Sequence, residues 1–227
     1  MPRTLNSRGP SVRERRRARE RSIVKATRAL FDRRARRDAQ VEEIARAAGI
    51  SKALVYRAFD SKQEIFLLTL TDYLAELRRR SDELPEMRDR IVELRSICEI
   101  YADFCLEYPA FLDCALALMQ RDAADLREQV SGTAWLRLGS ALASNVGRLA
   151  RVLQAGAQDG VFTVDDPDLA ANRLCVQLLG SMHLARSGAG VRESAPGVAD
   201  VFEIDPAHVR ERSVGDALAL AGVSAAA

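Results

Sequence analysis

Residues 41–59 constrain the fold more than any other part of this chain. Their sequence, VEEIARAAGISKALVYRAF, holds two short apolar patterns on either side of Gly49. Apolar residues that recur every three or four positions indicate helices, and a glycine between them permits the positive φ of a tight turn. The segment is therefore predicted to form two short helices, 41–48 and 52–59, in a helix-turn-helix arrangement.

The second of these helices is predicted to have a buried and an outward side, and Ser51 is expected to cap it. At about 100° per residue, Lys52, Ala53, Tyr56 and Arg57 lie opposite the apolar residues. This outward side suits the major groove of DNA, where Lys and Arg donate to guanine and apolar groups meet the thymine methyl; Tyr56 can equally bond a phosphate. The core of the motif is expected to consist of Ile44, Ala45, Ala48, Ile50, Val55, Ala58 and Phe59.

Charge is unevenly divided along the chain. Residues 1–62 contain 18 Lys plus Arg and 7 Asp plus Glu, whereas residues 63–227 contain 16 and 25. A basic end joined to an acidic remainder implies a polyanionic partner for the basic end only. Taken alone, the arginine cluster could equally be a solvated helix face; it comprises Arg13, Arg15, Arg16, Arg17, Arg19 and Arg21.

The remaining sequence predicts an all-α fold, because no segment shows the sustained period-two alternation of half-buried strands. Ser61 and Glu64 form the S-x-x-E pattern of a helix start, and two Asp-Pro pairs, at 166–167 and 205–206, mark other starts. Residues 187–204 are predicted to be a mobile loop. The other expected helices are 13–34, 62–81, 88–107, 110–120, 122–158, 167–186 and 206–221.

The run GISKALVYRAF at 49–59, followed by DSKQEI at 60–65, closely resembles the signature of the TetR family of bacterial transcription regulators. The resemblance covers about residues 20–70, and elsewhere only the helical layout is similar. It implies a three-helix DNA-binding head at 1–61 and a helical ligand-binding and dimerisation domain at 62–227. It also implies that a homodimer binds a palindromic double-stranded DNA operator.

The resemblance assigns roles to individual residues of the motif. Lys52, Ala53 and Arg57 would face bases and Tyr56 would contact a phosphate. Lys62 would hold another phosphate together with the amino end of its helix, which attracts anions for a direct physical reason. Gln40 stands where the family commonly has a capping Thr that contacts phosphate, so capping is expected to pass to Asp38.

Two further departures from the family pattern affect the head. Ala35 replaces a Gly that usually ends the first helix in a left-handed conformation, so Ala35 either bears a strain of about 1 kcal/mol or lets the helix continue. We expect the longer helix. Leu54 and Ala58 replace residues that are more often polar, which makes the outer surface unusually apolar.

The arginines at the start of the chain have a matching role in the resemblance. Relatives with basic extensions lay them into the minor groove or along the backbone, and arginine suits narrow grooves. We therefore expect an arm that includes Arg15, Arg16 and Arg17 to contact DNA.

The resemblance assigns dimer contact to the last two helices, 169–186 and 209–220. Their small residues would permit close packing between subunits, although these helices could instead be internal core. The small residues are Ala170, Ala171, Gly180, Ala185, Ala217 and Ala219.

An effector cavity is expected in the body, lined by apolar residues with a few polar groups. Each candidate could also be ordinary core, and the lining favours an uncharged or aromatic compound. The candidates are Tyr101, Phe104, Cys105, Met119, Trp135, Leu138, Leu178, Met182 and His183.

Other classes find little support in the sequence. There is no P-loop, G-x-G-x-x-G or G-x-S-x-G motif, and the two histidines lack partners at metal-ligand spacing, so neither an enzyme nor a cofactor is expected. The longest uncharged run, 174–185, is too short for a bilayer, and the four cysteines suit buried thiols, which predicts a cytoplasmic protein. A repressor released by a small ligand is expected; an activator, a regulator controlled by a protein partner and a nonspecific architectural DNA binder are the alternatives.

Overall fold

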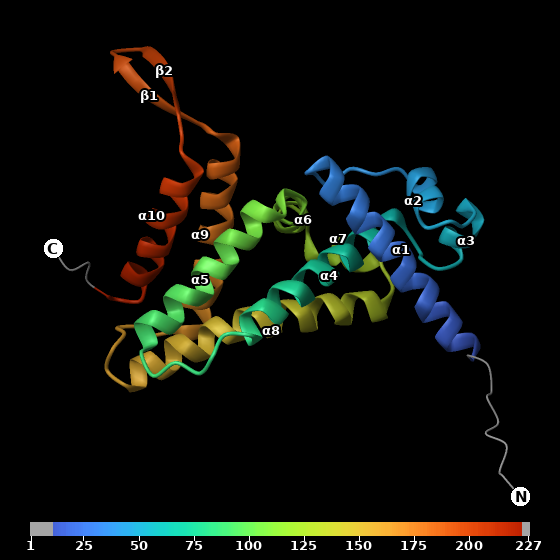
Figure 1. The fold of residues 1–227 in the computed structure, drawn as a ribbon, viewed down its shortest axis with the longest axis horizontal. Helices are drawn as coiled ribbons and strands as arrows, with labels where there is room; N and C mark the ends of the chain where they lie inside the picture. The colour runs from blue at the N-terminus through green and yellow to red at the C-terminus, as the bar shows by residue number, and fades with distance from the viewer. Residues whose placement is uncertain (1–10, 224–227) are drawn as a thin grey trace, which may run out of the picture.

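The computed structural model describes residues 11–223, which form helices almost throughout (Figure 1). This confirms the predicted all-α class. The helices are α1 (Val12–Arg34), α2 (Val41–Ala47), α3 (Lys52–Tyr56), α4 (Lys62–Asp82), α5 (Arg90–Glu107), α6 (Pro109–Met119), α7 (Ala123–Glu128), α8 (Gly132–Gln158), α9 (Pro167–Ser187) and α10 (Pro206–Leu220).

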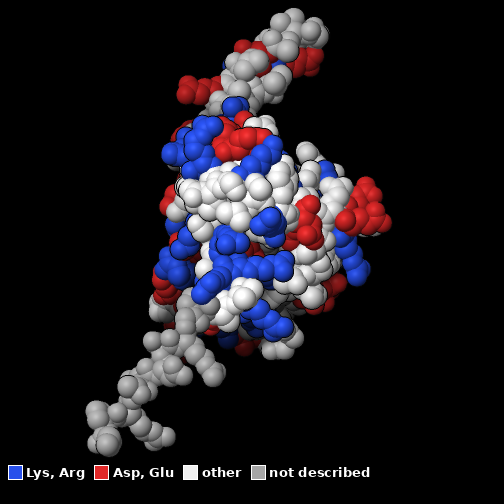
Figure 2. All heavy atoms as spheres, turned by 90° about the vertical axis from the view of Figure 1, so that its right-hand side faces the viewer, with Lys and Arg blue, Asp and Glu red and all other residues white. Residues whose placement is uncertain are grey.

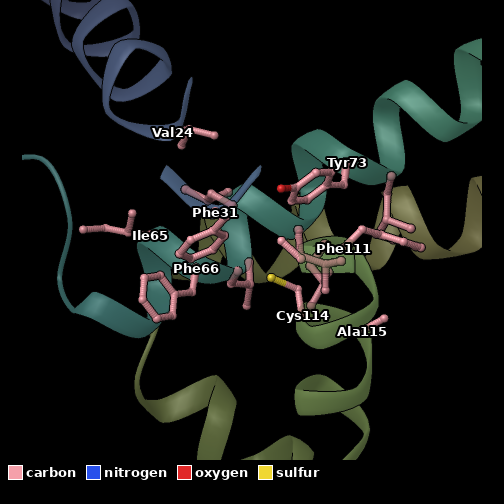
Figure 3. Packing of buried hydrophobic residues seen from close by; sticks show 14 of the residues in the cluster. Val24, Phe31, Ile65, Phe66, Tyr73, Phe111, Cys114 and Ala115 are labelled. Atoms are coloured by element: carbon pink, nitrogen blue, oxygen red, sulfur yellow. The ribbon is translucent and has the colours of Figure 1, made fainter. Parts of the chain in front are cut away.

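Helices α1–α3 form a head at one end of the molecule, and α4–α10 form a body (Figure 1). Helix α4 runs from the head into the body beside α8, and α5, α9 and α10 pack at the far end. The predicted boundary after residue 61 falls at the loop before α4, but the apolar core is continuous across it. Val24 and Phe31 of α1 share one cluster with Ile65 and Phe66 of α4 (Figure 3).

This shared cluster is rich in aromatic contacts. The ring centroids of Phe31 and Phe66 lie 5.0 Å apart in an edge-to-face arrangement, and those of Tyr73 and Phe111 lie 5.9 Å apart. Aromatic pairs at such distances stabilise a core beyond their buried area. The head is therefore fixed to α4 and α6 by packing.

The first helix ends differently from the expectation. Helix α1 stops at Arg34, and Ala35 adopts the left-handed conformation with φ 51°. The Ala35 N–H donates to the Asp32 carbonyl at 3.2 Å, and the Arg36 N–H donates to the Phe31 carbonyl at 3.3 Å. The prediction of a longer helix was wrong, because stopping here lets the chain turn back and bury Ala39 and Val41.

Three other segments also differ from the prediction. Helix α3 ends at Tyr56 rather than at residue 59. The single helix expected over 122–158 is two helices, α7 and α8, because Ser131 accepts the Ala134 N–H and so begins a new helix. Residues 88 and 89 precede α5, whose first turn is capped by Asp89.

The segment expected to be a mobile loop is a β-hairpin of β1 (Ala189–Ala195) and β2 (Val198–Glu203). Val191 lies opposite Val201, and Arg192 is ion-paired with Asp200 across the strands. The alternation was missed because each strand is short and only partly apolar.

Candidate DNA-binding surface

The turn between α2 and α3 is built as the motif predicts. Gly49 has a φ of 67°, and the Ile50 N–H donates to the Ala45 carbonyl at 3.0 Å. Ser51 then caps α3 by accepting the Leu54 N–H at 3.4 Å. Val55 and Phe59 are buried, so the pair of helices is anchored to the head from one side.

The opposite side of α3 faces solvent. Lys52, Ala53, Tyr56 and Arg57 are all exposed, and Tyr56 retains 55% of its accessible surface. Although α3 ends at Tyr56 and not at residue 59, this arrangement is kept, because the Phe59 N–H donates to the Val55 carbonyl at 3.1 Å. We call Lys52, Ala53, Tyr56 and Arg57 the reading face. Figure 2 looks onto the head end of the molecule, where Lys and Arg side chains gather across the centre.

One residue of the reading face already has a partner within the protein. Lys52 is ion-paired with Glu42 of α2, and its ammonium lies 5.7 Å from the centre of the Tyr56 ring. The hydrogen bond to Glu42 raises the pKa of Lys52. Sequence reasoning missed Glu42, although its position in α2, ten residues before Lys52, is close to the turn. The Lys52 ammonium is therefore paired with a carboxylate of the protein and is not a free charge on the reading face.

The structure brings Gln40 and Lys62 together. Gln40, not Asp38, is the N-cap residue of α2, and its N–H donates to Glu43 at 2.8 Å. The expectation that Asp38 would cap this helix was wrong. The Lys62 ammonium lies 3.5 Å from the Gln40 side-chain oxygen, at the first turn of α4. Two side chains that were expected near phosphates thus share one place on the surface.

The arginines expected in an arm belong to a helix. Ser11 and Glu14 form a capping box at the start of α1, so Arg15, Arg16 and Arg17 are helical and exposed. Residues 1–10 of the expected arm lie outside the described residues. Arg16 and Arg17 line a groove of about 420 Å³ beside the start of α8, where Glu20 of α1 is ion-paired with Arg137.

A buried carboxylate connects the head to the body. Glu64 is only 4% exposed, and its two oxygens accept the Asp60 N–H at 2.7 Å and the Ser131 hydroxyl. Ser61 adds a second link, because its hydroxyl donates to the Gln129 carbonyl at 2.6 Å. The S-x-x-E pattern indicated a helix start, but it gave no signal of this contact with the start of α8.

The body contains an apolar cavity of about 230 Å³ between α4, α5, α6, α8 and α9. Tyr101 and Met119 line it, as expected for an effector site. Burial raises the pKa of Tyr101 well above its ordinary value, so this phenol stays protonated. The lining includes other residues that sequence reasoning did not select, among them Leu70, Leu74, Phe111, Leu142, Asn145 and Leu179.

The other seven effector candidates do not line this cavity. His183 is exposed on α9, and Trp135 is partly buried on α8. The remaining five are packed in the core, because helical spacing does not distinguish a cavity wall from solid core; they are Phe104, Cys105, Leu138, Leu178 and Met182.

Most of the small residues of α9 and α10 that were expected at a subunit contact are buried within this chain. The two helices pack against each other. Gly180 and Ala219 are exposed, together with Leu169, Val176 and Leu184 on α9. The residues that were expected at a subunit contact but are buried within this chain are Ala170, Ala171, Ala185 and Ala217.

The comparisons with known proteins concern first the helix-turn-helix head and then the fold of the whole chain. Residues 23–69 match the family model of bacterial regulatory proteins, tetR family. Residues 23–69 are therefore similar to the amino-terminal region of this family, in agreement with the resemblance seen in the motif. The comparison with curated proteins found no match.

Solved structures share the fold of the whole chain. RolR in complex with resorcinol is 17% identical, with a TM-score of 0.69 over 93% of this chain and 91% of RolR. PfmR, a TetR family transcriptional regulator from Thermus thermophilus, is 20% identical, with a TM-score of 0.58 over 90% of this chain and 99% of PfmR. FadR from Bacillus subtilis in complex with stearoyl-CoA is 14% identical, with a TM-score of 0.65 over 90% and 99% of the two chains. The chain thus shares its overall fold with these proteins.

Across residues 11–223, the structure has no helix with the length and apolar character needed to cross a membrane.

Proposed function

We propose that this protein is a sequence-specific DNA-binding transcriptional repressor, not an enzyme, and that a small apolar or aromatic molecule releases it from its operator. The observation that carries the proposal is the reading face. Lys52, Tyr56 and Arg57 point to solvent from a helix whose other side, Val55, is fully buried. A rigidly held helix with donors on its free side suits base readout in the major groove.

The proposed DNA-bound form is a homodimer on a palindromic operator. Two heads must reach successive major grooves about 34 Å apart, which requires a two-fold arrangement of subunits. The exposed stripe on α9 supports this, because Leu169, Val176 and Leu184 are 57%, 51% and 45% exposed. Exposed Gly180 on α9 and Ala219 on α10 permit helices of a second subunit to approach closely.

The proposed release mechanism uses α4 as the connection between cavity and head. Leu70 and Leu74 of α4 line the apolar cavity, and the same helix begins beside Gln40 with Lys62. A ligand that binds more tightly to one position of α4 favours a dimer whose heads are wrongly spaced. The complexes of RolR with resorcinol and of FadR with stearoyl-CoA support a ligand-responsive body.

The test is to select genomic DNA fragments with the purified full chain and to repeat the binding with an excess of random duplex. A sequence-specific regulator retains a preference of about a thousandfold or more for its selected fragment. Equal binding to random DNA would contradict the proposal and favour a nonspecific architectural protein. Candidate apolar and aromatic compounds are then added to the complex, and release of the selected fragment tests the proposed control by a ligand.

A further inference from the structure

A second cavity lies where the head meets the body, and its volume is about 260 Å³. Its walls come from α4, α6 and α7 and from Arg37, which lies in the loop between α1 and α2. It is distinct from the apolar cavity of the body, and the two share part of their walls, because Leu70 and Leu118 line both.

The rim of this cavity consists of four hydrogen-bonding side chains, two of which are positively charged. Arg37, Gln63, Gln120 and Arg121 line it, and the described lining contains no Asp or Glu. The Arg37 guanidinium lies 5.0 Å from the centre of the Phe66 ring, and the Lys62 ammonium lies 5.2 Å from the same ring. Two cations thus lie close to Phe66, and one of them, Arg37, also lines the cavity.

The charges of the two rim arginines are not compensated inside the protein. Within residues 11–223, neither the Arg37 nor the Arg121 guanidinium forms an ion pair, and Arg121 donates only to the neutral Gln129 side chain at 2.6 Å. Asp113 accepts a hydrogen bond from the Arg37 backbone N–H at 3.3 Å. Asp113 is itself ion-paired with Arg186, so its charge is already balanced.

The floor is apolar and chemically inert. Phe66, Leu67 and Leu118 supply most of it together with Cys114, whose sulfur is directed toward the side on which Phe66 lies (Figure 3). Burial raises the pKa of the Cys114 thiol to about 12, so the thiol is uncharged at neutral pH. A ligand would therefore meet positive donors at the rim and hydrocarbon beneath them.

We propose that this junction cavity binds an amphipathic organic anion, with its carboxylate at Arg37 and Arg121 and its apolar part over Phe66 toward Leu70 and Leu118. Guanidinium groups suit carboxylates because their planar donors match the two oxygens. Arg37 belongs to the head and Arg121 to the body, so one anion bridges both. The effect of this bridge on DNA rests on the proposed function, whereas binding of the anion does not.

The experiment uses isothermal titration of the full chain without DNA, with octanoate and the uncharged octanamide as probes. Octanoate is expected to bind at least about tenfold more tightly than octanamide, since charge-assisted hydrogen bonds are the strong ones. Arg37→Gln and Arg121→Gln should each weaken octanoate binding about tenfold. Both substitutions should leave octanamide binding within about twofold, because the apolar floor is unchanged.

Arg36→Gln and Arg127→Gln are the matched controls, because both are exposed arginines of the same two regions of the chain and neither lines the cavity. They should leave octanoate binding unchanged, and thermal melts of all four variants verify that they fold. The proposal would be overturned by absent or nonsaturable octanoate binding, by equal affinity for the two probes, or by equal losses in the control variants. Any of these results leaves the selection of DNA fragments unaffected, so failure of this site is distinguishable from failure of DNA recognition.

Discussion

Replacing Ala35 by Gly should stabilise the protein. Ala35 is exposed and holds a left-handed backbone with φ 51° and ψ 28°, so the substitution removes strain without removing buried side-chain packing. A left-handed L-residue costs about 1–2 kcal/mol. The greater conformational freedom of Gly in the unfolded chain offsets about 0.4–1 kcal/mol of the stability gained by removing the strain. The midpoints of these two ranges give an expected net gain of about 0.8 kcal/mol in the free energy of unfolding.

The assay is urea unfolding followed by circular dichroism, at one protomer concentration for every variant because dimerisation shifts apparent stability. Ala29→Gly is the matched control, since Ala29 is exposed within the same helix. It should destabilise by about 1 kcal/mol, because Gly disfavours a helix interior. The same chemical change thus has opposite signs at two nearby positions. An Ala35→Gly variant that is no more stable than the parent would refute the reasoning about α1.

Three further predictions concern the head and its attachment. The combined replacement of Arg15, Arg16 and Arg17 by Ala should weaken binding to all DNA sequences alike. The slope of log affinity against log salt concentration should become shallower by about 0.9 for each phosphate that is no longer neutralised. An unchanged slope would show that these arginines form a solvated face. Ser131→Ala should lower the free energy of unfolding in urea by about 2–3 kcal/mol, because it removes the cap of α8 and the partner of buried Glu64. Ser11→Ala removes only a cap and should lower it by about 1 kcal/mol. Equal losses would contradict a stabilising contact between Ser131 and Glu64. Glu43 has its pKa held at about 2, below its ordinary 4.5, chiefly by the Arg34 hydrogen bond, so its stabilising effect is present above pH 4.5 and is lost as pH falls through 2. Glu43→Gln should therefore reduce the acid-induced loss of stability over this range, and an unchanged pH profile would argue against the pairing.

The arrangement of the reading face could be predicted from the sequence because it depends on local periodicity. Val55 and Phe59 fall on one side of a helix wherever that helix lies, and burial of one side exposes Lys52 and Arg57 on the other. The turn at Gly49 could also be predicted locally, because glycine readily adopts the positive φ that the turn requires. The helix-turn-helix was therefore the best-determined part of the chain.

The end of α1 and the hairpin could not be predicted in the same way, since each depends on competing terms of similar size. A left-handed Ala35 is locally unfavourable, but the return of the chain to bury Val41 outweighs the strain. The hairpin is held by pairs such as Val191 with Val201, which come from two separate strands. Local patterns contain neither of these tertiary contributions.

The contacts between distant segments were also beyond the sequence. Glu64 meets Ser131, and Arg37 shares a cavity with Arg121, although each pair is far apart along the chain. Effector candidates were chosen for chemistry, and only packing decides which apolar side chains border a space. This is why Tyr101 and Met119 line the apolar cavity while Phe104 is solid core.

The most direct test of the account compares Arg57→Ala with the parent on the selected operator fragment and on random duplex of equal length. Arg46→Ala is the control, because Arg46 is an exposed arginine of α2 outside the reading face. If α3 reads base edges, Arg57→Ala loses about 1–3 kcal/mol of preference for the operator while its affinity for random DNA changes little. Equal losses on both duplexes, or an unchanged preference, would contradict the claim that Arg57 reads sequence.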